Sequence, residues 1–426
     1  MAQRTLAVVL ALLCVLGWGC SSGPVTLTVA GGASGQELEL TVDGARRFEN
    51  LHPNITVVVR PTPANSSERL TFYQKIFDQR SSDVDILQVD VIWPAIVAEH
   101  AVNMRDYMRS SDLEMHFPKI LESYEVDGKL VAVPWFTDLP VLYYRTDLLK
   151  KYGFEGPPKT WGELYDMASA IQAGERAAGR PDFWGYVWQG GAYEGLTCNA
   201  LEWQYSHGGG GILDEEGNPS VSNEETAVAF QRASSWIADI SPQETVSFVE
   251  DDSRAIWQRG NAAFMRNWTN AYALSKQDGY LADKFNVTEL PSGGYASAMT
   301  LGGWGLMISR YSDHPSQAAE LVRFLVRDRE QRMRAIGGTF APTMPDLYKD
   351  PAVLDAMPFF LKIEDYLNKA VLRPALQAGD RYDEVSQAYW QAAHDILNGA
   401  DARTRLRRAE EEIRTAMGSG SEGSGD

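Results

Sequence analysis

The feature that most constrains the fold of this chain is an alternation of strand-like and helix-like segments that starts at residue 25. Residues 25–30 (VTLTVA) alternate as a strand does, and apolar residues from Leu38 to Leu51 then recur at helical spacing. Residues 55–60 (ITVVVR) and 84–93 (VDILQVDVIW) are two further strand candidates. A chain that alternates in this way buries a mainly parallel sheet between helices, which predicts an α/β fold.

A second alternation follows the segment 134–149 (PWFTDLPVLYYRTDLL), which itself reads as strand material with one acid among apolar residues. Strand-like stretches recur at 183–188, 260–268 and 302–309, and the C-terminal third is mostly helical, including a helix over 316–336. With 426 residues, of which 44% are hydrophobic, the chain is longer than single domains usually run. We therefore expect two lobes, with the chain crossing between them near residues 134–149.

The N-terminus has the pattern of an export signal. One basic residue, Arg4, precedes an apolar run that is too short to span a membrane, and small residues surround Cys20. The segment resembles a bacterial lipoprotein signal, although Gly17 stands where that signal usually has Leu. We expect cleavage after residue 19 and a lipid on Cys20; the alternative is a cleaved signal without lipid. Cys198 then remains as the only thiol, which excludes an intramolecular disulfide in the mature chain.

Charge and local motifs exclude several classes of function. The formal net charge of −18 argues against nucleic acid or an anionic lipid surface as a partner. No GxGxxG or GxxxxGK[ST] motif supports nucleotide binding, and no HExxH, thiol cluster or GxSxG elbow supports a metal or nucleophile centre. We expect no cofactor and no bound metal.

Acids and tryptophans at strand ends remain as candidates. Asp90 and Asp138 each interrupt an apolar strand, and Trp268 and Trp304 flank two others. Taken singly, each acid is as well explained by a salt bridge or cap, and each tryptophan by core packing. Together, however, carboxylates accept hydrogen bonds from vicinal hydroxyls, and flat aromatic rings cover the C–H face of a pyranose. This combination predicts a sugar site.

The chain resembles the extracellular solute-binding proteins of ABC sugar importers, the maltose-binding-protein-like family, and within it the trehalose/maltose-binding branch. The stretches that carry the resemblance follow the family's order: GGASGQELEL, RRFENLHPNITV, DILQVDVIWP, GKLVAVPWFTDLPVLYYRTDLLKKYG, PPKTWGEL, FWGYVWQGGAYEGLTC, WQRGNAAFMRNW, TLGGWGLMIS and VLRPAL. The resemblance implies a two-lobe periplasmic-binding-protein fold, in which two mainly parallel sheets flanked by helices enclose a ligand cleft.

The resemblance also sets the expected boundaries. A signal peptide (1–19) and a lipid-anchor spacer (20–24) precede an N-terminal lobe made of residues 25–134 and 301–338. The C-terminal lobe takes residues 135–300 and 339–417, and the Gly/Ser-rich end, 418–426, is expected to be disordered.

Ten ligand-binding residues are implied by the resemblance. Eight match polar contacts, backbone donors or aromatic walls of the family: Glu37, Arg69, Asp90, Asp138, Trp268, Gly303, Trp304 and Arg373. Two depart from the branch, in which both positions are tyrosine: Phe136 keeps a stacking face without a hydroxyl, and Asn270 exchanges stacking for hydrogen bonding.

The function that the resemblance implies is non-catalytic. A monomer held outside the cytoplasmic membrane would bind a glucose-containing disaccharide or short oligosaccharide and deliver it to the permease of an ABC importer. Two alternatives stay open. Asp90 and Asp138 are a possible acid and nucleophile pair of a secreted glycosidase, and the same fold could carry another solute, such as a polyol phosphate, which favours more Arg and Lys in the cleft.

Overall fold

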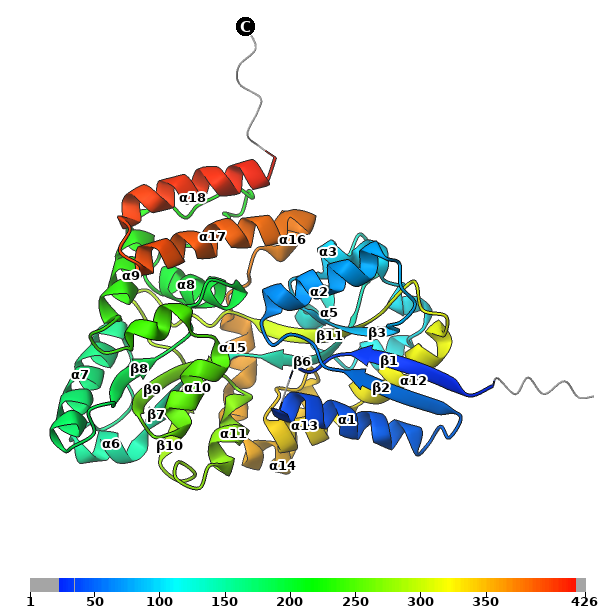
Figure 1. The fold of residues 1–426 in the computed structure, drawn as a ribbon, viewed down its shortest axis with the longest axis horizontal. Coiled ribbons are helices and arrows are strands. Elements are labelled where there is room, and N and C mark those ends of the chain that lie inside the picture. Colours follow the sequence, from blue (N-terminus) through cyan, green and yellow to red (C-terminus); the bar gives the residue numbers. More distant parts are fainter. Residues whose placement is uncertain (1–22, 34, 419–426) are drawn as a thin grey trace, which may run out of the picture.

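The structure, a computed structural model, describes residues 23–33 and 35–418. Two sheets, each covered by helices, form two lobes that lie side by side (Figure 1). The predicted signal peptide, Cys20 and the tail from residue 419 onward lie outside the described residues. Within the described part of the chain, none of the helices is both long enough and apolar enough to cross a bilayer.

The first lobe is built on a sheet of five strands. In spatial order these are β2 (Ile55–Arg60), β1 (Val25–Ala30), β3 (Ile86–Asp90), β11 (Gly302–Ile308) and β6 (Val133–Asp138). Its helices are α1 (Gly35–Glu49), α2 (Ser66–Asp78), α3 (Pro94–Val97), α4 (Ser110–Leu113), α5 (Pro118–Glu122), α12 (Pro315–Val326) and α13 (Asp328–Gly338). Helices α1, α12 and α13 pack on one another on one face, and α2 and α3 cover the other (Figure 1). A short hairpin joins β4 (Glu125–Val126) to β5 (Lys129–Leu130).

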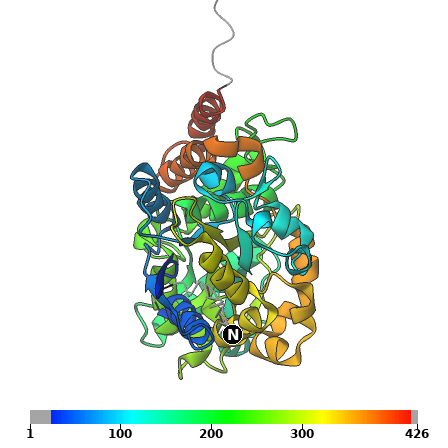
Figure 2. The same cartoon turned by 90° about the vertical axis from the view of Figure 1, so that its right-hand side faces the viewer.

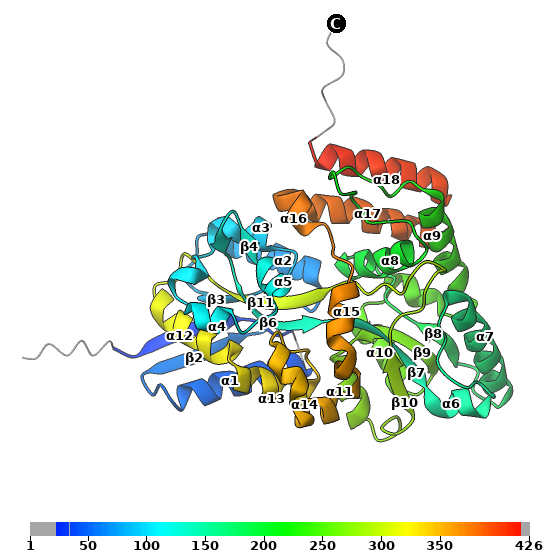
Figure 3. The same ribbon diagram turned by 180° about the vertical axis from the view of Figure 1, so that it is seen from behind.

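The second lobe is built on a sheet of four strands. Their order is β10 (Phe285–Thr288), β7 (Pro140–Arg145), β9 (Ala262–Trp268) and β8 (Trp184–Val187). Its helices are α6 (Thr146–Lys151), α7 (Trp161–Ala177), α8 (Glu194–Ser206), α9 (Glu224–Trp236), α10 (Glu250–Gln258), α11 (Ala271–Gln277), α16 (Ala375–Ala378), α17 (Tyr382–Leu397) and α18 (Ala402–Ala416). Helix α17 packs on α8, α9 and α18, and α18 forms one edge of the molecule (Figure 2). From behind, α14 (Pro351–Ala356) and α15 (Ile363–Lys369) lie along the junction between the lobes (Figure 3).

Both sheets are mixed, so the expectation of mainly parallel sheets is wrong. In the first sheet β1 runs parallel to β2 and β3, but β11 runs antiparallel to β3 and β6. In the second sheet only the β8–β9 pair is parallel. The apolar pattern shows that a strand is buried but not its direction, and a strand that enters a sheet from the other lobe need not follow the direction of a βαβ unit.

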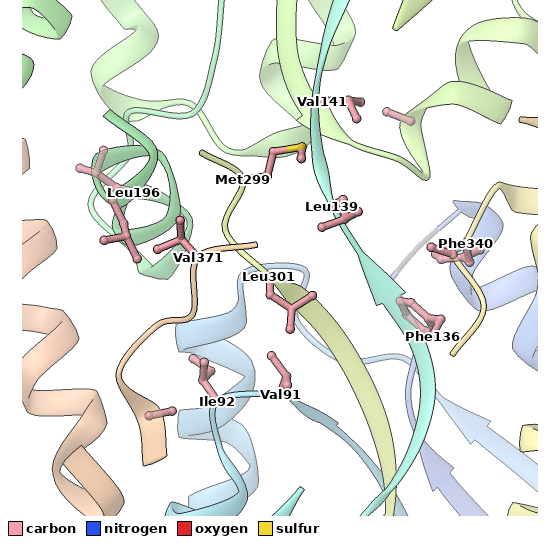
Figure 4. Close-up of a cluster of buried hydrophobic side chains, with 14 of the residues drawn as sticks. Val91, Ile92, Phe136, Leu139, Val141, Leu196, Met299, Leu301, Phe340 and Val371 are labelled. Carbon is pink, nitrogen blue, oxygen red and sulfur yellow. The ribbon is translucent and has the colours of Figure 1, made fainter. Parts of the chain in front are cut away.

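The chain passes between the sheets through a buried apolar junction. Strand β6 belongs to the first sheet up to Asp138 and β7 to the second, so this passage falls at Leu139, a few residues after the expected boundary. Leu139 lies beside Met299 and Leu301 of the returning segment (Figure 4). The backbone N–H of Leu301 donates to the carbonyl oxygen of Val371, and the Val371 N–H donates to that of Met299, at 3.0 and 2.9 Å. Three segments far apart in sequence therefore meet at the junction.

Two helices begin at side chains that cap them, and one predicted helix is divided. The Asn65 side chain accepts from the N–H groups of Ser67 and Glu68 at the start of α2, and Thr160 accepts from Glu163 at the start of α7. The helix expected over 316–336 forms as α12 and α13, because Arg327 between them is extended (φ −65°, ψ 158°). The apolar periodicity of residues 316–336 continues across Arg327, so the sequence pattern alone did not predict the break between α12 and α13.

Candidate functional site

A cleft of about 280 Å³ lies between the lobes. All ten residues predicted for the ligand site line it: Glu37, Arg69, Asp90, Phe136, Asp138, Trp268, Asn270, Gly303, Trp304 and Arg373. Its volume is close to the lower end of the range of about 300–1,000 Å³ that is usual for small-molecule pockets.

Strand register explains why four of these residues share one wall. Trp304 on β11 lies opposite Asp90 on β3 and opposite Phe136 on β6, and Gly302 lies opposite Asp138. Directly opposed residues, and residues two apart on one strand, project from the same face of a sheet. Asp90, Phe136, Asp138 and Trp304 therefore point together from the first sheet toward the cleft.

Asp138 is a buried carboxylate with a single hydrogen bond in the described structure. Its Oδ1 accepts from the Thr269 hydroxyl at 3.2 Å, and its exposed fraction is 7%. Burial raises the pKa of Asp138 to about 8, and the Thr269 hydrogen bond opposes this increase only in part. Among the described residues, no basic nitrogen lies within 4.0 Å of it. The carboxylate is therefore free to accept further hydrogen bonds from a bound molecule.

Glu37 of α1 and Arg69 of α2 line the cleft from the first lobe. The Glu37 carboxylate accepts from Gln88 Nε2 at 2.7 Å, and the Arg69 guanidinium lies 4.3 Å above the Trp304 ring. Arg69 Nε donates to the carbonyl oxygen of Pro63 at 2.9 Å, while its buried Nη1 has no protein partner. Arg69 thus orients Trp304 and keeps a donor available.

Trp268 is fixed from the second lobe. Its indole Nε1 donates to Glu250 Oε1 at 3.1 Å, and Tyr193 donates to the other Glu250 oxygen at 2.7 Å. The Arg266 guanidinium lies 4.3 Å above the indole ring and forms a fully buried ion pair with Glu202. A Cβ on Gly302 would approach Trp268 Cζ3 to 3.1 Å, so the glycine allows the two walls to meet closely.

Arg373 joins the two lobes at the cleft. Its Nη2 donates to Asp90 Oδ1 at 3.3 Å and its Nη1 to Glu194 Oε1 at 2.9 Å. Tyr382 and Ser386 also donate to Glu194, both at 2.6 Å. Burial raises the pKa of Asp90, and the Arg373 charge opposes this. Asp90 is therefore a structural ion-pair partner of Arg373 as well as a lining residue of the cleft.

Several lining residues were not predicted from the sequence. The second lobe adds residues from the first turns of α8 and α10 and from the segments before them: Tyr193, Glu194, Gly195, Cys198, Val249, Glu250, Asp251 and Arg254. Helix α10 was not predicted at all, although its three acids in the first turn are a recognisable start signal. Cys198, predicted to be the only thiol, is free and buried, and burial raises its pKa to about 12.

The charges of the lining residues favour an uncharged ligand with hydroxyl groups. Three arginines line the cleft, and each already has a partner: Arg69 contacts Trp304 and Pro63, Arg254 is paired with Asp251 at 2.6 Å, and Arg373 is paired as described above. The lining carboxylates are more numerous: Glu37, Asp90, Asp138, Glu194, Glu250 and Asp251. Within residues 23–33 and 35–418, no cluster of His, Cys, Asp and Glu is arranged to hold a metal ion.

Two lobes joined by crossing segments, with aromatic rings and carboxylates between them, define a protein that holds a small polar molecule in its cleft. Residues 33–332 match the sequence profile of the bacterial extracellular solute-binding proteins. The chain is 43% identical over 402 residues to a probable ABC transporter-binding protein of Deinococcus radiodurans, covering 94% of this chain and 95% of that protein. The chain therefore belongs to the bacterial extracellular solute-binding proteins, of the maltose-binding type that serves ABC transporters.

Solved structures are similar to the whole two-lobe unit. MalE3 of T. maritima bound to maltose is 35% identical with a TM-score of 0.87, covering 92% of this chain and 99% of that one. A solute-binding protein of Thermotoga lettingae bound to α-D-tagatose is 22% identical with a TM-score of 0.81 and the same coverage, which is a likeness of fold. The predicted two-lobe periplasmic-binding-protein fold is confirmed.

Proposed function

We propose that this protein binds a glucose-containing disaccharide or short oligosaccharide, of the maltose or trehalose kind, between its lobes and delivers it to a membrane permease. The observation that carries the proposal is the convergence of all ten expected residues on one cleft whose buried Asp138 has no basic partner within 4.0 Å among the described residues. MalE3 of T. maritima, a similar protein of known structure, is bound to maltose. In this proposal Asp138, Glu37 and Asp90 accept from sugar hydroxyls, and Trp268 and Trp304 cover the rings.

Closure of the lobes supplies the mechanism. A sugar that touches both walls binds the closed arrangement more tightly than the open one, and this differential affinity shifts the population toward closure. Asp138 lies one residue from the passage between the sheets, so its hydrogen bonds to the sugar act close to the hinge. The permease would then bind the closed protein. The segments 25–134 with 301–338 and 135–300 with 339–417 are the proposed moving parts.

The alternative cargo, a polyol phosphate, has less support. A dianionic phosphate is usually bound by arginines whose donors are free. Here Arg254 and Arg373 already pair with Asp251 and with Asp90 and Glu194, which leaves Arg69 Nη1 and Arg373 Nε as the buried guanidinium nitrogens of the lining arginines without a protein partner. A bound phosphate would lie among the lining carboxylates, which carry the same sign of charge. We therefore expect neutral sugars to bind more tightly than a polyol phosphate.

The proposed cellular location follows from the family and from the N-terminal sequence. We propose export by the signal over residues 1–19 and anchoring by a lipid on Cys20, with the folded part working as a monomer outside the cytoplasmic membrane. Replacing Cys20 by Ser should release the protein from the membrane fraction if the lipid is the anchor. Retention of the Cys20→Ser protein in that fraction would contradict lipid anchoring.

A thermal-unfolding screen tests the cargo. We expect maltose, trehalose or a related glucoside to raise the midpoint through mass action, and glycerol 3-phosphate to leave it unchanged. A shift with the phosphate and none with any neutral sugar would refute the proposal.

The glycosidase alternative needs a separate measurement. The comparisons indicate no catalytic family, since the relatives are binding proteins of transporters. Chromatography after prolonged incubation should return the bound sugar intact. Release of new reducing ends in proportion to protein, lost in Asp138→Asn, would instead assign Asp90 and Asp138 to hydrolysis.

A further inference from the structure

Arg334 of α13 is a buried guanidinium that neither the sequence nor the comparisons assign to a role. Its exposed fraction is 4%, and burial lowers its pKa to about 10. Nη1 makes one long hydrogen bond, to the Thr41 hydroxyl at 3.4 Å, and Nε and Nη2 have no protein partner. No acidic oxygen of the described residues lies within 4.0 Å of it. A buried cation without a paired acid is unfavourable for folding alone, so it calls for a functional explanation.

Three aromatic rings surround this guanidinium. Its Cζ lies 4.0 Å from the ring centre of Trp135, 5.0 Å from that of Phe136 and 4.8 Å from that of Phe340. Phe136 and Phe340 also contact each other edge to face, with centroids 4.8 Å apart, and both line the cleft. The cation therefore holds together the two rings that form part of the cleft wall. Figure 4 shows Phe136 and Phe340 facing each other beside the junction.

Arg334 contacts Phe136, which lies two residues before Asp138 on β6, and its charge also reaches that carboxyl group. The groups whose charge reaches Asp138 are Glu37 on α1, Asp90 on β3 and Arg334 on α13, and Thr269 donates the one hydrogen bond. Of the three charged groups, only Arg334 is positive. The nearby acid on its own helix, Glu330, is already paired with Arg47 at 2.6 Å and with Arg327 at 3.2 Å.

We propose that Arg334 is a positioning residue of the sugar site, which fixes the Phe136 and Phe340 wall and supplies a positive charge that favours the ionised form of Asp138, the form that accepts from sugar hydroxyls. This inference rests on the proposed function for its effect on sugar affinity, but its effect on Asp138 does not require a ligand. It also accounts for Phe136, which departs from the tyrosine of the branch: its ring packs against both a cation and Phe340.

The test compares four variants of the whole protein. Arg334→Met removes the charge, Arg334→Lys keeps it, and Phe340→Leu removes one ring of the wall. Arg327→Met is the matched control, because Arg327 also stacks on a phenyl ring, that of Phe324 at 3.8 Å, and also has an unpartnered Nε, but does not line the cleft. Two quantities are measured: the titration of the Asp138 carboxyl carbon by NMR in the ligand-free protein, identified by its loss in Asp138→Asn, and maltose affinity from pH 6 to pH 9.

Arg334→Met is expected to raise the Asp138 titration midpoint by about one pH unit and, through this charge effect, to weaken maltose binding at pH 7 about threefold, with the affinity profile displaced to higher pH. Arg334→Lys and Arg327→Met should keep the wild-type midpoint, and Phe340→Leu should weaken binding equally at every pH.

An unmoved Asp138 midpoint in Arg334→Met overturns the inference, as does an equal loss of affinity at every pH. If Arg334→Met does not fold, Arg334→Lys serves as the test. An Asp138 titration midpoint displaced by as much as one pH unit in Arg334→Lys refutes the role of the charge, because the charge is kept. An unmoved Asp138 midpoint together with weakened maltose binding supports the inference. Absence of maltose binding in the wild type would count against the proposed function alone, because the ligand-free titration still reports on Arg334.

Discussion

Replacement of Asp138 by Asn is the most informative single change, because it removes the charge and keeps the shape. One carboxylate oxygen accepts from Thr269, which leaves the other for the ligand. A hydrogen bond from a neutral donor to a charged acceptor contributes about 1.5–3 kcal/mol, so the loss of one such bond predicts about 2 kcal/mol, or roughly 30-fold in Kd. Asp138→Ala, which removes both oxygens, should cost at least as much.

The pH dependence of sugar binding should also differ between the wild type and Asp138→Asn, and its direction follows from the pKa of Asp138. Burial raises the pKa of Asp138 to about 8, and sugar hydroxyls that donate to the ionised form lower this pKa in the complex. Below pH 8 the sugar must therefore displace a proton, so affinity falls as the pH falls, by up to about tenfold per pH unit. Asn cannot ionise, so the affinity of the variant should be nearly independent of pH in this range.

Isothermal titration calorimetry with maltose at pH 6, 7, 8 and 9 measures both effects. We expect the wild-type affinity for maltose to increase from pH 6 to pH 8. Plotted against pH, the affinities of the wild type and of Asp138→Asn should converge toward low pH. Equal affinities at pH 8, or a wild-type affinity that does not change with pH, would refute the reasoning from the burial of this carboxylate.

Three further predictions concern stability and the cleft walls. In the ligand-free protein the folded state holds the Asp138 proton up to pH 8, so wild-type stability falls as the pH rises. Between pH 5 and pH 8.5 the free energy of unfolding of the wild type should fall by about 4 kcal/mol relative to that of Asp138→Asn in urea unfolding. Arg373→Met leaves Asp90 and Glu194 buried without their cation and should lower the free energy of unfolding by about 3–5 kcal/mol. The control Arg381→Met breaks an exposed pair with Glu384 and should lower the free energy of unfolding by less than about 1 kcal/mol. Similar losses in the two variants would contradict the ion-pair assignment. Trp304→Ala should weaken maltose binding by about 2 kcal/mol, while Trp184→Ala, which removes an indole stacked by Arg176 away from the cleft, should leave the calorimetric Kd unchanged.

The sequence predicted where the principal strands form and which residues meet at the cleft. Apolar runs identify β1 and β3 because burial on both faces leaves a direct trace in composition, and β2, an edge strand of half-buried and exposed residues, was recognisable from its β-branched run. Asp90 and Asp138 were recognisable because a charged side chain is rare in such a run. Asp90, Asp138, Trp268 and Trp304 were candidates from their place at strand ends, and the other six site residues came from the resemblance, since no local pattern would have brought Arg69 and Arg373 together.

The features that the sequence did not predict depend on tertiary packing. Strand direction is not encoded in apolar alternation, so the mixed sheets were missed. Glu194 and Glu250 lie in first turns of helices, where acids usually serve the helix dipole, and their position at the cleft depends on how α8 and α10 pack. Arg334 reads as one more basic residue of an amphipathic helix, and only the fold surrounds it with Trp135, Phe136 and Phe340.

Calorimetric titration of the wild-type protein at pH 8 with maltose, trehalose and glycerol 3-phosphate tests the central claim most directly. We expect saturable binding of one neutral sugar per chain and no heat from the phosphate. Binding of the phosphate alone, or no binding of any neutral glucoside, would contradict the assignment of this cleft to a sugar.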